Sequence, residues 1–353
     1  MKVWFDIRSL DEKNHYGSMM LKIIKKLIEV DNKNEYTLYT NTSIWLIENE
    51  KITAAKIWNP ISDFSLSKEI KNDWLALVVF FDHRVPLFYK QDFMVMIPSL
   101  KESFFMGKDF LAREIYNYYM KKSIERAKKI ICFEKNTLLE LNERLNVNET
   151  KIQIMHPFFD VVRQENTQTA LQIDIKAKHN LSNDYLIYDW GNGTNKNIEK
   201  LIQTFEKINK SWKDLNLFIL WESTSKDTDI RDMVVRANLQ DRIQFIADIS
   251  IQEEPFYYRW SKWVIFPSIY ESFPFSLKKA VKYWSPILAS DIKSIRLFMW
   301  DSIDYFNPKS THDMEDAIRK FIKSRKKRDY TEVFTKLTLP NTIKQFYSII
   351  MKG

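Results

Sequence analysis

The chain has 353 residues, and its 54 lysines and arginines against 46 aspartates and glutamates give a formal charge of +8 at pH 7. Its 16 tyrosines, 24 phenylalanines and 11 tryptophans exclude a disordered chain, and the length suffices for one large or two medium α/β domains. Only five glycines occur, which argues against several glycine-rich phosphate loops, and a single cysteine, Cys132, excludes an intramolecular disulfide and a cysteine-built zinc site.

The N-terminal segment MKVWFDIRSLDEKN lacks the run of about 7–15 apolar residues that marks a signal peptide. No stretch approaches the roughly 18–20 uncharged apolar residues of a membrane-spanning helix. We therefore expect a cytoplasmic protein in a reducing compartment. The pI of about 9.1 suggests an anionic neighbour, either a nucleotide, a phospholipid surface or nucleic acid. A lysine-rich composition without functional meaning is the alternative.

Short apolar runs alternate with amphipathic stretches along nearly the whole chain, which is typical of parallel sheets built from βαβ units. The pattern of the first half predicts strands at residues 2–7, 36–40, 75–81, 93–97, 129–133 and 151–155. It predicts helices at residues 18–30, 109–127 and 137–145. A polar stretch between Phe159 and Ser182 then predicts a linker.

A second alternating series follows the linker. It predicts strands at residues 185–190, 216–221, 242–246, 263–267 and 286–289, and helices at residues 197–208, 228–237, 252–260 and 275–283. A last helix is predicted after Pro340, which separates it from the preceding chain. We expect an α/β protein of two doubly wound, Rossmann-like domains facing across a cleft, since ligands bind at the carboxyl ends of such strands.

The turn after the strand at residues 185–190 is a candidate anion site. Gly191, Asn192 and Gly193 open a helix that begins near Asn197, and its unpaired N–H groups and dipole favour a negative charge. Lys196 lies beside this end and would give a diphosphate a charge-assisted contact. An ordinary helix N-terminus with a solvated lysine is the alternative.

Three segments of the second half resemble a known family: YLIYDWGNGTNKNIEKLIQTF, LQDRIQFIADIS and WVIFPSIYESFPFSLKKAVKYWSPILASDIKSI. They are similar to the donor-binding domain of retaining GT-B glycosyltransferases of the family-four type, which include sucrose synthases, phosphatidylinositol mannosyltransferases and lipopolysaccharide glucosyltransferases. In the first half, HYGSMMLKIIKKL resembles the glycine loop and helix of this family, and KKIICFEKNTLLEL resembles its interdomain approach.

The resemblance implies a GT-B architecture with an acceptor domain at residues 1–165 and a donor domain at residues 166–338. Residues 339–353 would form a helix that returns to the first domain. The resemblance also implies a nucleotide-sugar donor and no metal or other cofactor. Glu271 would position the donor sugar and Lys196 would stabilise the leaving phosphate. The implied donor-binding residues are Gly17, Gly191, Asn192, Gly193, Asn197, Ser272, Phe273 and Lys279.

The sequence departs from the family pattern at several positions. Lys279 stands where a glutamate normally binds the nucleotide ribose, and an ammonium cannot accept hydrogen bonds from ribose hydroxyls. Lys279 would pair with a phosphate or a different sugar, or it is an ordinary surface lysine. The other departures are Pro98-Ser99 for a His-Asp pair, Glu134 for a serine, Pro157-Phe158 for an Asn-Gly turn, and Trp284-Ser285 for a glycine.

Two histidines are candidates to substitute for the missing histidine of the family pattern, and one of them, His83, is with Arg84 a candidate for the acceptor side. His83 and Arg84 follow the strand at residues 75–81, and Asp82 precedes them. Because adjacent side chains point apart, Asp82 is not automatically an orienting partner for the imidazole of His83. His156 follows the last strand of the first domain, near the expected hinge. A solvent-facing histidine is the alternative for both.

The segment at residues 109–129 interleaves basic residues with tyrosines. This composition suits an interfacial helix on anionic lipid, where a lipid-linked acceptor would be presented. It also suits a solvated face whose aromatic residues turn into the core. No recognition motif accompanies the charge, so nucleic acid is not an expected partner.

Two functions of different class are compatible with these features. The first is a retaining, metal-independent glycosyltransferase of cell-surface polysaccharide or glycoconjugate synthesis, which acts on a glycan or lipid-linked acceptor in the cytoplasm or at the inner face of the membrane. The second is a catalytically degenerate GT-B homologue that serves as a binding or chaperone subunit of an active glycosyltransferase. A third, less favoured hypothesis is a two-domain nucleotide-sugar epimerase of similar architecture.

Overall fold

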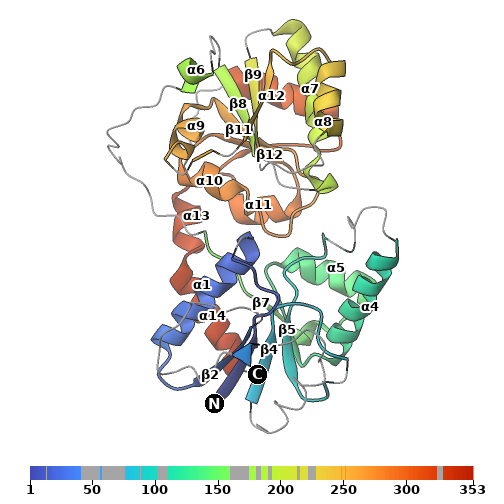
Figure 1. Cartoon of the computed structure of the whole chain (residues 1–353), viewed down its shortest axis with the longest axis vertical. Helices are drawn as coiled ribbons and strands as arrows, with labels where there is room; N and C mark the ends of the chain where they lie inside the picture. The colour runs from blue at the N-terminus through green and yellow to red at the C-terminus, as the bar shows by residue number, and fades with distance from the viewer. Residues whose placement is uncertain are drawn as a thin grey trace. The chain divides into compact units, whose positions relative to one another are not determined.

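The computed structural model describes residues 1–12, 14–40, 56–57, 76–87, 89–101, 103, 110–159, 175–179, 184–189, 193–212, 215–221, 228–247, 249–250, 252–323 and 329–352. The chain divides into two compact units (Figure 1). Unit 1 comprises Met1–Phe158 and Lys336–Gly353, and unit 2 comprises Phe159–Thr335. The divisions thus fall after Phe158 and Thr335, a few residues before the positions expected from the sequence.

Unit 1 is built on a parallel sheet of seven strands in the order β3-β2-β1-β4-β5-β6-β7. The strands are β1 (Lys2–Asp6), β2 (Glu35–Thr40), β3 (Lys56–Ile57), β4 (Ala76–Phe80), β5 (Phe93–Met96), β6 (Lys129–Cys132) and β7 (Ile152–Ile154). All four residues of β5 are buried, which explains its continuous apolar run, because helices cover both faces of a doubly wound sheet. Except for the two-residue β3, every strand of this sheet was predicted.

The helices of unit 1 lie on both faces of its sheet (Figure 1). They are α1 (His15–Val30), α4 (Phe110–Arg126), α5 (Lys135–Leu145), the 3-10 turn η1 (Glu149–Lys151) and α14 (Leu339–Met351). Helix α1 begins three residues before the predicted start, because Asn14 caps it: the Asn14 side chain accepts a hydrogen bond of 2.6 Å from the Gly17 N–H.

Helix α14 packs within unit 1, although it comes last in the chain. The Phe346 ring stacks on Phe5 of β1 with centroids 5.9 Å apart and meets Phe81 edge-on at 6.2 Å. The expectation that Pro340 precedes the helix is wrong. Pro340 lies in the first turn, where its missing N–H is not needed, and Thr338 caps the helix.

Phe346→Ala is expected to destabilise unit 1 by about 3–5 kcal/mol, the usual cost of removing a buried phenylalanine. Phe346 is fully buried, whereas Lys344 on the same helix is exposed. Thermal unfolding of Phe346→Ala should therefore occur roughly 10 °C lower than in the parent, since 1 kcal/mol shifts the melting temperature by about 2–4 °C in a unit of this size. Lys344→Ala is the matched control and should melt like the parent.

Unit 2 contains a parallel sheet of six strands in the order β10-β9-β8-β11-β12-β13. The strands are β8 (Asp184–Asp189), β9 (Leu215–Trp221), β10 (Ile243–Ala247), β11 (Trp263–Phe266), β12 (Ile287–Ser290) and β13 (Asp304–Phe306). The first five were predicted and β13 was not. The strand order reverses between β8 and β11, and this switch point is where doubly wound sheets bind ligands.

The helices of unit 2 cover both faces of this sheet (Figure 1). They are α6 (Ile175–Lys178), the 3-10 turn η2 (Thr194–Lys196), α7 (Ile198–Ser211), α8 (Thr228–Arg236), α9 (Glu254–Trp260), α10 (Leu277–Lys282), α11 (Lys293–Met299), α12 (Thr311–Lys323) and α13 (Thr331–Lys336). Helices α7, α8 and α12 bury their apolar residues against one face in a single core cluster. The two units thus confirm the predicted α/β class.

Candidate functional site

The switch point of unit 2 brings together the two residues that the sequence singled out for catalysis. Lys196 is the last residue of η2, the 3-10 turn between β8 and α7. Glu271 lies on the loop that follows β11. The Lys196 Nζ atom lies 2.5 Å from Glu271 Oε1. Their side chains are only 13% and 12% exposed, so this ion pair is largely withdrawn from water. The sequence predicted both residues and did not predict that they pair.

Two asparagines hold the segments of this ion pair in place. The buried Asn195 side chain donates to the Tyr270 carbonyl at 2.9 Å, and the Ile269 N–H donates to the Asn195 carbonyl at 2.8 Å. The Asn197 amide donates to the carbonyls of Pro267 and Pro308, each at 3.0 Å. These hydrogen bonds tie the η2 turn to the loop after β11, so the positions of Lys196 and Glu271 are coupled.

The chain after β8 does not enter helix α7 directly from the glycine turn. Gly193 has a φ of 137°, a conformation that favours glycine, and η2 separates it from α7. Asn197, in the left-handed conformation with a φ of 58°, ends η2 and precedes the first helical residue, Ile198. Lys196 therefore lies in a 3-10 turn that immediately precedes Asn197, the N-cap residue of α7. Gly191 and Asn192 lie outside the described residues.

The loop after β11 is anchored by aromatic packing. Phe273 is buried, and its ring meets Phe275 and Phe298 edge-on with centroids 4.7 and 4.6 Å apart. It also contacts the Phe159 ring at 5.1 Å. Ser272, between Glu271 and Phe273, is buried as well. This anchoring fixes the loop that carries Glu271, and it gives the side chain of Phe273 a packing role.

Lys279 of α10 is engaged in an ion pair. Its Nζ atom lies 2.7 Å from Glu254 Oε2 of α9, and the Tyr283 hydroxyl donates to Glu254 Oε1 at 2.9 Å. At the end of β8, Asp189 accepts a hydrogen bond of 2.7 Å from the Tyr258 hydroxyl. Burial raises the pKa of Asp189, and the positive charge of Lys279 opposes this rise. Opposite charges thus surround the carboxyl end of β8.

Three members of this polar group were not predicted from the sequence: Asp189, Glu254 and Tyr258. Asp189 is the next-to-last residue of a predicted strand, and the other two lie in a predicted helix. The available signal was positional: a carboxylate at the carboxyl end of the first strand of a doubly wound sheet faces the region where ligands bind.

In unit 1 the strand order reverses between β1 and β4, and charged residues follow both strands. Arg8 Nη2 lies 2.6 Å from Asp6 Oδ2. After β4, the His83 Nδ1 atom contacts Asp82 Oδ1, and Arg84 Nε donates to Asp82 Oδ2 at 2.6 Å. Asp82 thus orients the His83 imidazole, and the expectation that these adjacent side chains point apart is wrong here. Alternation of adjacent side chains holds within a strand, and β4 ends at Phe80.

The carboxylate of Asp82 is strongly acidic. Burial alone would raise its pKa, but the hydrogen bond and charge of His83 and the charge of Arg84 outweigh it and lower the pKa of Asp82 to about 2. The His83 ring packs on Tyr116 of α4 with centroids 4.1 Å apart, and its side chain is 10% exposed. The Arg84 side chain, by contrast, is 66% exposed. The cluster of Asp82, His83 and Arg84 thus presents an oriented imidazole and an accessible guanidinium.

Two further residues singled out in unit 1 have structural contacts. A Cβ atom at Gly17 would lie 2.1 Å from the Asp11 carbonyl oxygen, so only glycine allows α1 to approach this loop so closely. His156 follows β7, and its N–H donates to the Gln345 side chain at 2.9 Å while its carbonyl accepts from the Thr342 hydroxyl at 2.8 Å. Burial lowers the pKa of the His156 imidazole.

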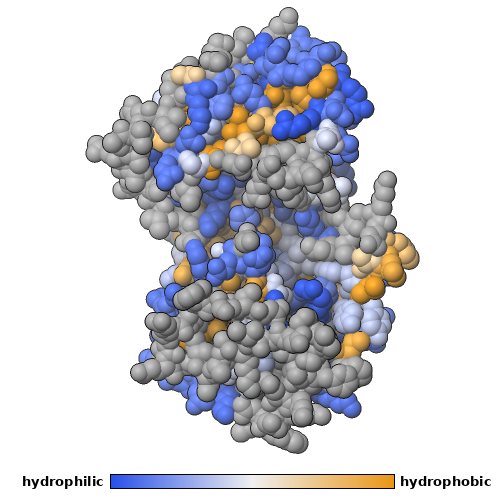
Figure 2. Space-filling view, viewed as in Figure 1, coloured by the Kyte–Doolittle hydropathy of each residue, from blue (hydrophilic) through white to orange (hydrophobic). Residues whose placement is uncertain are grey.

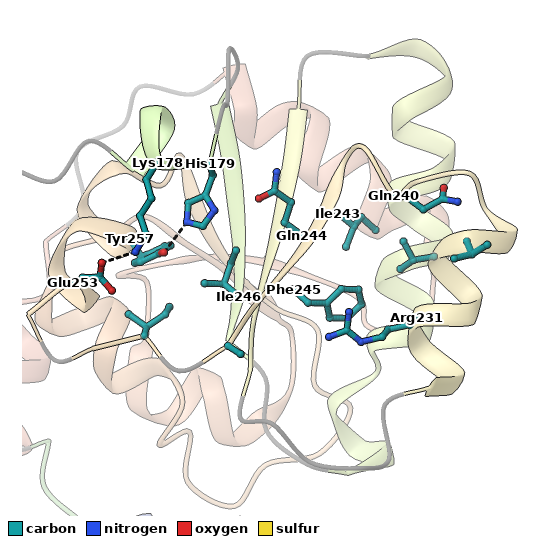
Figure 3. A pocket seen from close by; sticks show the side chains of 14 residues that line it. Lys178, His179, Arg231, Gln240, Ile243, Gln244, Phe245, Ile246, Glu253 and Tyr257 are labelled. Atoms are coloured by element: carbon teal, nitrogen blue, oxygen red, sulfur yellow. Dashed lines mark hydrogen bonds and ion pairs between the residues drawn. The ribbon is translucent and has the colours of Figure 1, made fainter.

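A pocket of about 670 Å³ lies along the edge strand β10 and contains none of the residues that the sequence singled out (Figure 3). At one end, Lys178 pairs with Glu253 at 2.5 Å and His179 Nε2 lies 2.7 Å from the Tyr257 hydroxyl. At the other end, the Arg231 guanidinium lies over the Phe245 ring at 4.4 Å. This pocket is separate from the switch point, because β8 and β11 do not line it.

Comparison with known proteins shows likeness to glycosyltransferases. The chain is 23% identical over 238 residues to the O-antigen chain mannosyltransferase RfbU of Salmonella typhimurium, and the match covers 67% of this chain but only 62% of that protein. The structure of Anabaena Alr3699/HepE in complex with UDP has a TM-score of 0.76 at 10% identity and is covered completely, as is this chain. Sucrose-phosphate synthase from Thermosynechococcus elongatus gives 0.66 at 13% identity, with 99% and 95% covered.

The family model named "Glycosyl transferases group 1" matches residues 172–336, which is nearly the whole of unit 2. Unit 1 also contains a doubly wound parallel sheet, and the matching solved structure covers unit 1 as well as unit 2. This chain therefore has the GT-B fold, and the glycosyl transferases group 1 model matches residues 172–336, somewhat less than half of the chain.

Proposed function

We propose that this protein is a nucleotide-sugar-dependent glycosyltransferase of cell-surface polysaccharide or glycoconjugate synthesis. The observation that carries the proposal is the Lys196–Glu271 pair at the switch point of a glycosyl transferases group 1 domain. Its support comes from the likeness to an O-antigen chain mannosyltransferase and to a structure solved with UDP. The acceptor in this proposal is a glycan or a lipid-linked sugar.

Each member of the pair has a role in the transfer. A bond forms between an acceptor hydroxyl oxygen and the anomeric carbon as the bond from that carbon to the phosphate breaks. Lys196 stabilises the negative charge that develops on the leaving diphosphate, and Glu271 accepts a hydrogen bond from the donor sugar. In a same-face reaction the leaving phosphate takes the acceptor's proton, and the anomeric configuration is retained. Because Lys196 supplies the positive charge at the phosphate, the proposal needs no metal cofactor.

The Lys279–Glu254 pair is proposed to hold the nucleoside end of the donor. Ribose hydroxyls need a hydrogen-bond acceptor, and the Lys279 ammonium group offers only donors. Glu254 presents its carboxylate from α9, and Lys279 and the Tyr283 hydroxyl hold it in place. In this arrangement a carboxylate on α9 replaces the one that the family carries at position 279.

The acceptor side of the proposal lies in unit 1. The Asp82 carboxylate fixes the His83 imidazole through Nδ1, which leaves Nε2 to contact an acceptor hydroxyl. Arg84, with its exposed guanidinium, suits an acceptor that carries a phosphate.

Nucleotide binding tests the donor site. Lys196→Ala is expected to weaken the binding of a nucleoside diphosphate by at least about 1 kcal/mol, roughly fivefold, because it removes a charged hydrogen bond. Calorimetry with UDP and GDP measures the effect, and Lys210→Ala is the matched control, because Lys210 lies in the last turn of α7 and is 72% exposed.

Nucleotide release and thermal shift of the parent protein decide between the two functions. An active enzyme should slowly release nucleotide from at least one nucleotide-sugar in the absence of acceptor. No release from a full donor panel, together with no thermal shift on adding any nucleotide, would favour the alternative in which this chain is a binding or chaperone subunit of an active glycosyltransferase.

Helix α4 is proposed to contact an anionic membrane surface. Phe110, Leu111, Ile115 and Tyr118 are 65%, 68%, 50% and 51% exposed, and Figure 2 shows hydrophobic surface over the start of this helix. Tyr118 is exposed, whereas Tyr116 of the same helix packs against the core of unit 1, so only part of the aromatic set turns inward. No helix among the described residues is long and apolar enough to cross a bilayer. The proposal therefore places the protein in the cytoplasm, bound peripherally at the inner face of the membrane.

Vesicle binding tests the role of α4. Phe110→Glu combined with Leu111→Glu should reduce cosedimentation with phosphatidylglycerol vesicles by about 100-fold, since burying each side chain contributes roughly 1.5–3 kcal/mol. Leu139→Glu, at an exposed leucine of α5, is the matched control and should bind like the parent. Equal binding by all three proteins would remove α4 from the membrane contact.

A further inference from the structure

Helix α5 begins with two buried polar side chains. Glu134, the residue that precedes its first helical residue, and Thr137 in its first turn are each only 1% exposed. Glu134 follows β6 at the carboxyl edge of the unit 1 sheet. A charged residue type is seldom buried this completely unless a partner satisfies it.

Each of these side chains has an oxygen atom without a partner in the described part of the chain. Glu134 Oε2 and Thr137 Oγ1 are buried and have no hydrogen-bond partner there, and the Glu134 side chain does not cap the helix that it precedes. Buried polar atoms are nearly always paired, so two such atoms on one helical turn require an explanation.

This turn lies at the same edge of the sheet as Asp82 and His83. The Tyr16 hydroxyl donates to the Phe81 carbonyl at 2.8 Å, and the Tyr16 ring lies 5.8 Å from the ring of Phe133. One side chain of α1 therefore contacts the residues that immediately precede Asp82 and Glu134. The Asp82–His83 pair and the start of α5 are therefore both linked to Tyr16 at this edge of the unit 1 sheet.

The chemistry of the two atoms selects the class of ligand. A carboxyl oxygen accepts a hydrogen bond and a threonine hydroxyl can donate one, and alcohol groups can serve both because they donate as well as accept. An anion would meet the Glu134 oxygen unfavourably. A metal ion lacks ligands, since the described part of the chain contains no group of three or more His, Cys, Asp or Glu side chains that could hold one. Sugar hydroxyls fit this pair of atoms best.

Burial supports the choice of a neutral ligand. Desolvation, assisted by the negative charge of Glu140 on the same helix, raises the pKa of Glu134 to about 8. The neighbouring Cys132 thiol has its own pKa raised by burial and by Glu134, and the Tyr16 hydroxyl likewise has a raised pKa. Both remain uncharged near pH 7, as does His156, whose pKa is lowered and whose side chain is bonded to the backbone of Phe133. No cation is thus present among these groups to hold a carboxylate.

We propose that Glu134 and Thr137 form a binding site for hydroxyl groups of the sugar acceptor. This inference rests on the proposed function and deepens it, because it assigns recognition of the acceptor sugar to the first turn of α5. Glu134 stands where the family pattern has a serine, so the longer side chain reaches the acceptor as a carboxyl group.

The test measures acceptor-dependent nucleotide release from the full-length protein. The probes are the methyl glycosides of glucose, galactose, mannose and N-acetylglucosamine, with a nucleotide-sugar that the parent hydrolyses. Glu134→Ala and Thr137→Val should raise the acceptor KM at least tenfold, while the donor KM and the acceptor-free hydrolysis rate stay within twofold. Glu143→Gln, at an exposed position of the same helix, should leave all of these values unchanged.

Thermal unfolding separates binding from a structural role. Thr137→Val keeps the shape and removes a hydroxyl that has no partner, so its melting temperature should equal or exceed that of the parent. A lower melting temperature with an unchanged acceptor KM would overturn the inference, and so would a parent that no glycoside stimulates. A parent that hydrolyses no donor at all would instead overturn the proposed function, and with it this inference.

Discussion

Glu271→Ala is expected to reduce turnover by roughly 100-fold or more. A carboxylate that contacts the reacting sugar stabilises the transition state, and a well-placed contact of this kind contributes about 2.7 kcal/mol or more. The effect should appear in kcat and kcat/KM together, with a smaller change in the affinity for nucleoside diphosphate. Glu206→Ala is the control, since Glu206 lies on α7 and is 39% exposed. The enzyme function would be contradicted if the parent turned over no donor and Glu271→Ala left the nucleotide affinity unaltered. The binding or chaperone subunit function would then be favoured.

The stability of the variants distinguishes lost chemistry from lost structure. Glu271→Ala leaves the Lys196 ammonium without its ion-pair partner in a site that is largely withdrawn from water. Breaking a buried pair in this way costs roughly 3–5 kcal/mol, whereas replacing both partners with apolar residues is often nearly neutral. The double variant Lys196→Met with Glu271→Leu should therefore melt near the parent temperature and remain inactive. Equal destabilisation in the double variant would show that the pair serves folding.

Glu134→Gln is expected to stabilise the protein at pH 8 by several kcal/mol. The pKa of Glu134 is raised from 4.5 to about 8 in the folded protein, chiefly by burial. Between these values the folded state binds a proton that the unfolded state has released, so stability is full below pH 4.5 and falls as the pH rises to about 8. Each unit of pKa shift corresponds to about 1.4 kcal/mol, so the free energy of unfolding falls by about 4–5 kcal/mol over this pH range.

Urea unfolding at pH 5 and pH 8 measures this difference. The parent should lose stability between the two values, and Glu134→Gln should lose markedly less, because an amide does not ionise. Glu143→Gln should follow the parent, since Glu143 is exposed. Parallel curves for the parent and Glu134→Gln would show that Glu134 is already ionised in the folded protein and would contradict the burial argument.

The strands of both sheets were predictable because their signal is local. A strand buried on both faces reads as a continuous apolar run, as in FMVM of β5 and WVIF of β11, and no tertiary information is needed to recognise it. Helix α12 was not predicted, although its sequence carries a helical pattern. Its buried Met314, Ile318 and Phe321 have helical spacing, yet no helix was predicted between residues 290 and 340.

The ion pairs of unit 2 were not predictable in this way. Lys196 and Glu271 were singled out one by one, but 75 positions separate them along the chain. They meet because β8 and β11 are neighbours where the strand order reverses, and strand order depends on the packing of whole βαβ units. The same holds for Lys279 and Glu254, whose helices follow different strands.

Local periodicity by itself determined the class of the fold, the succession of strands and helices, and the candidate residues at the ends of strands. Tertiary structure decided which of these residues lie together and which are withdrawn from water. Glu134 shows why: in the sequence it is a charged residue at a helix start, a position normally solvated. Its burial depends on the strands and helices that surround the edge of the unit 1 sheet, and desolvation by those distant segments sets its pKa.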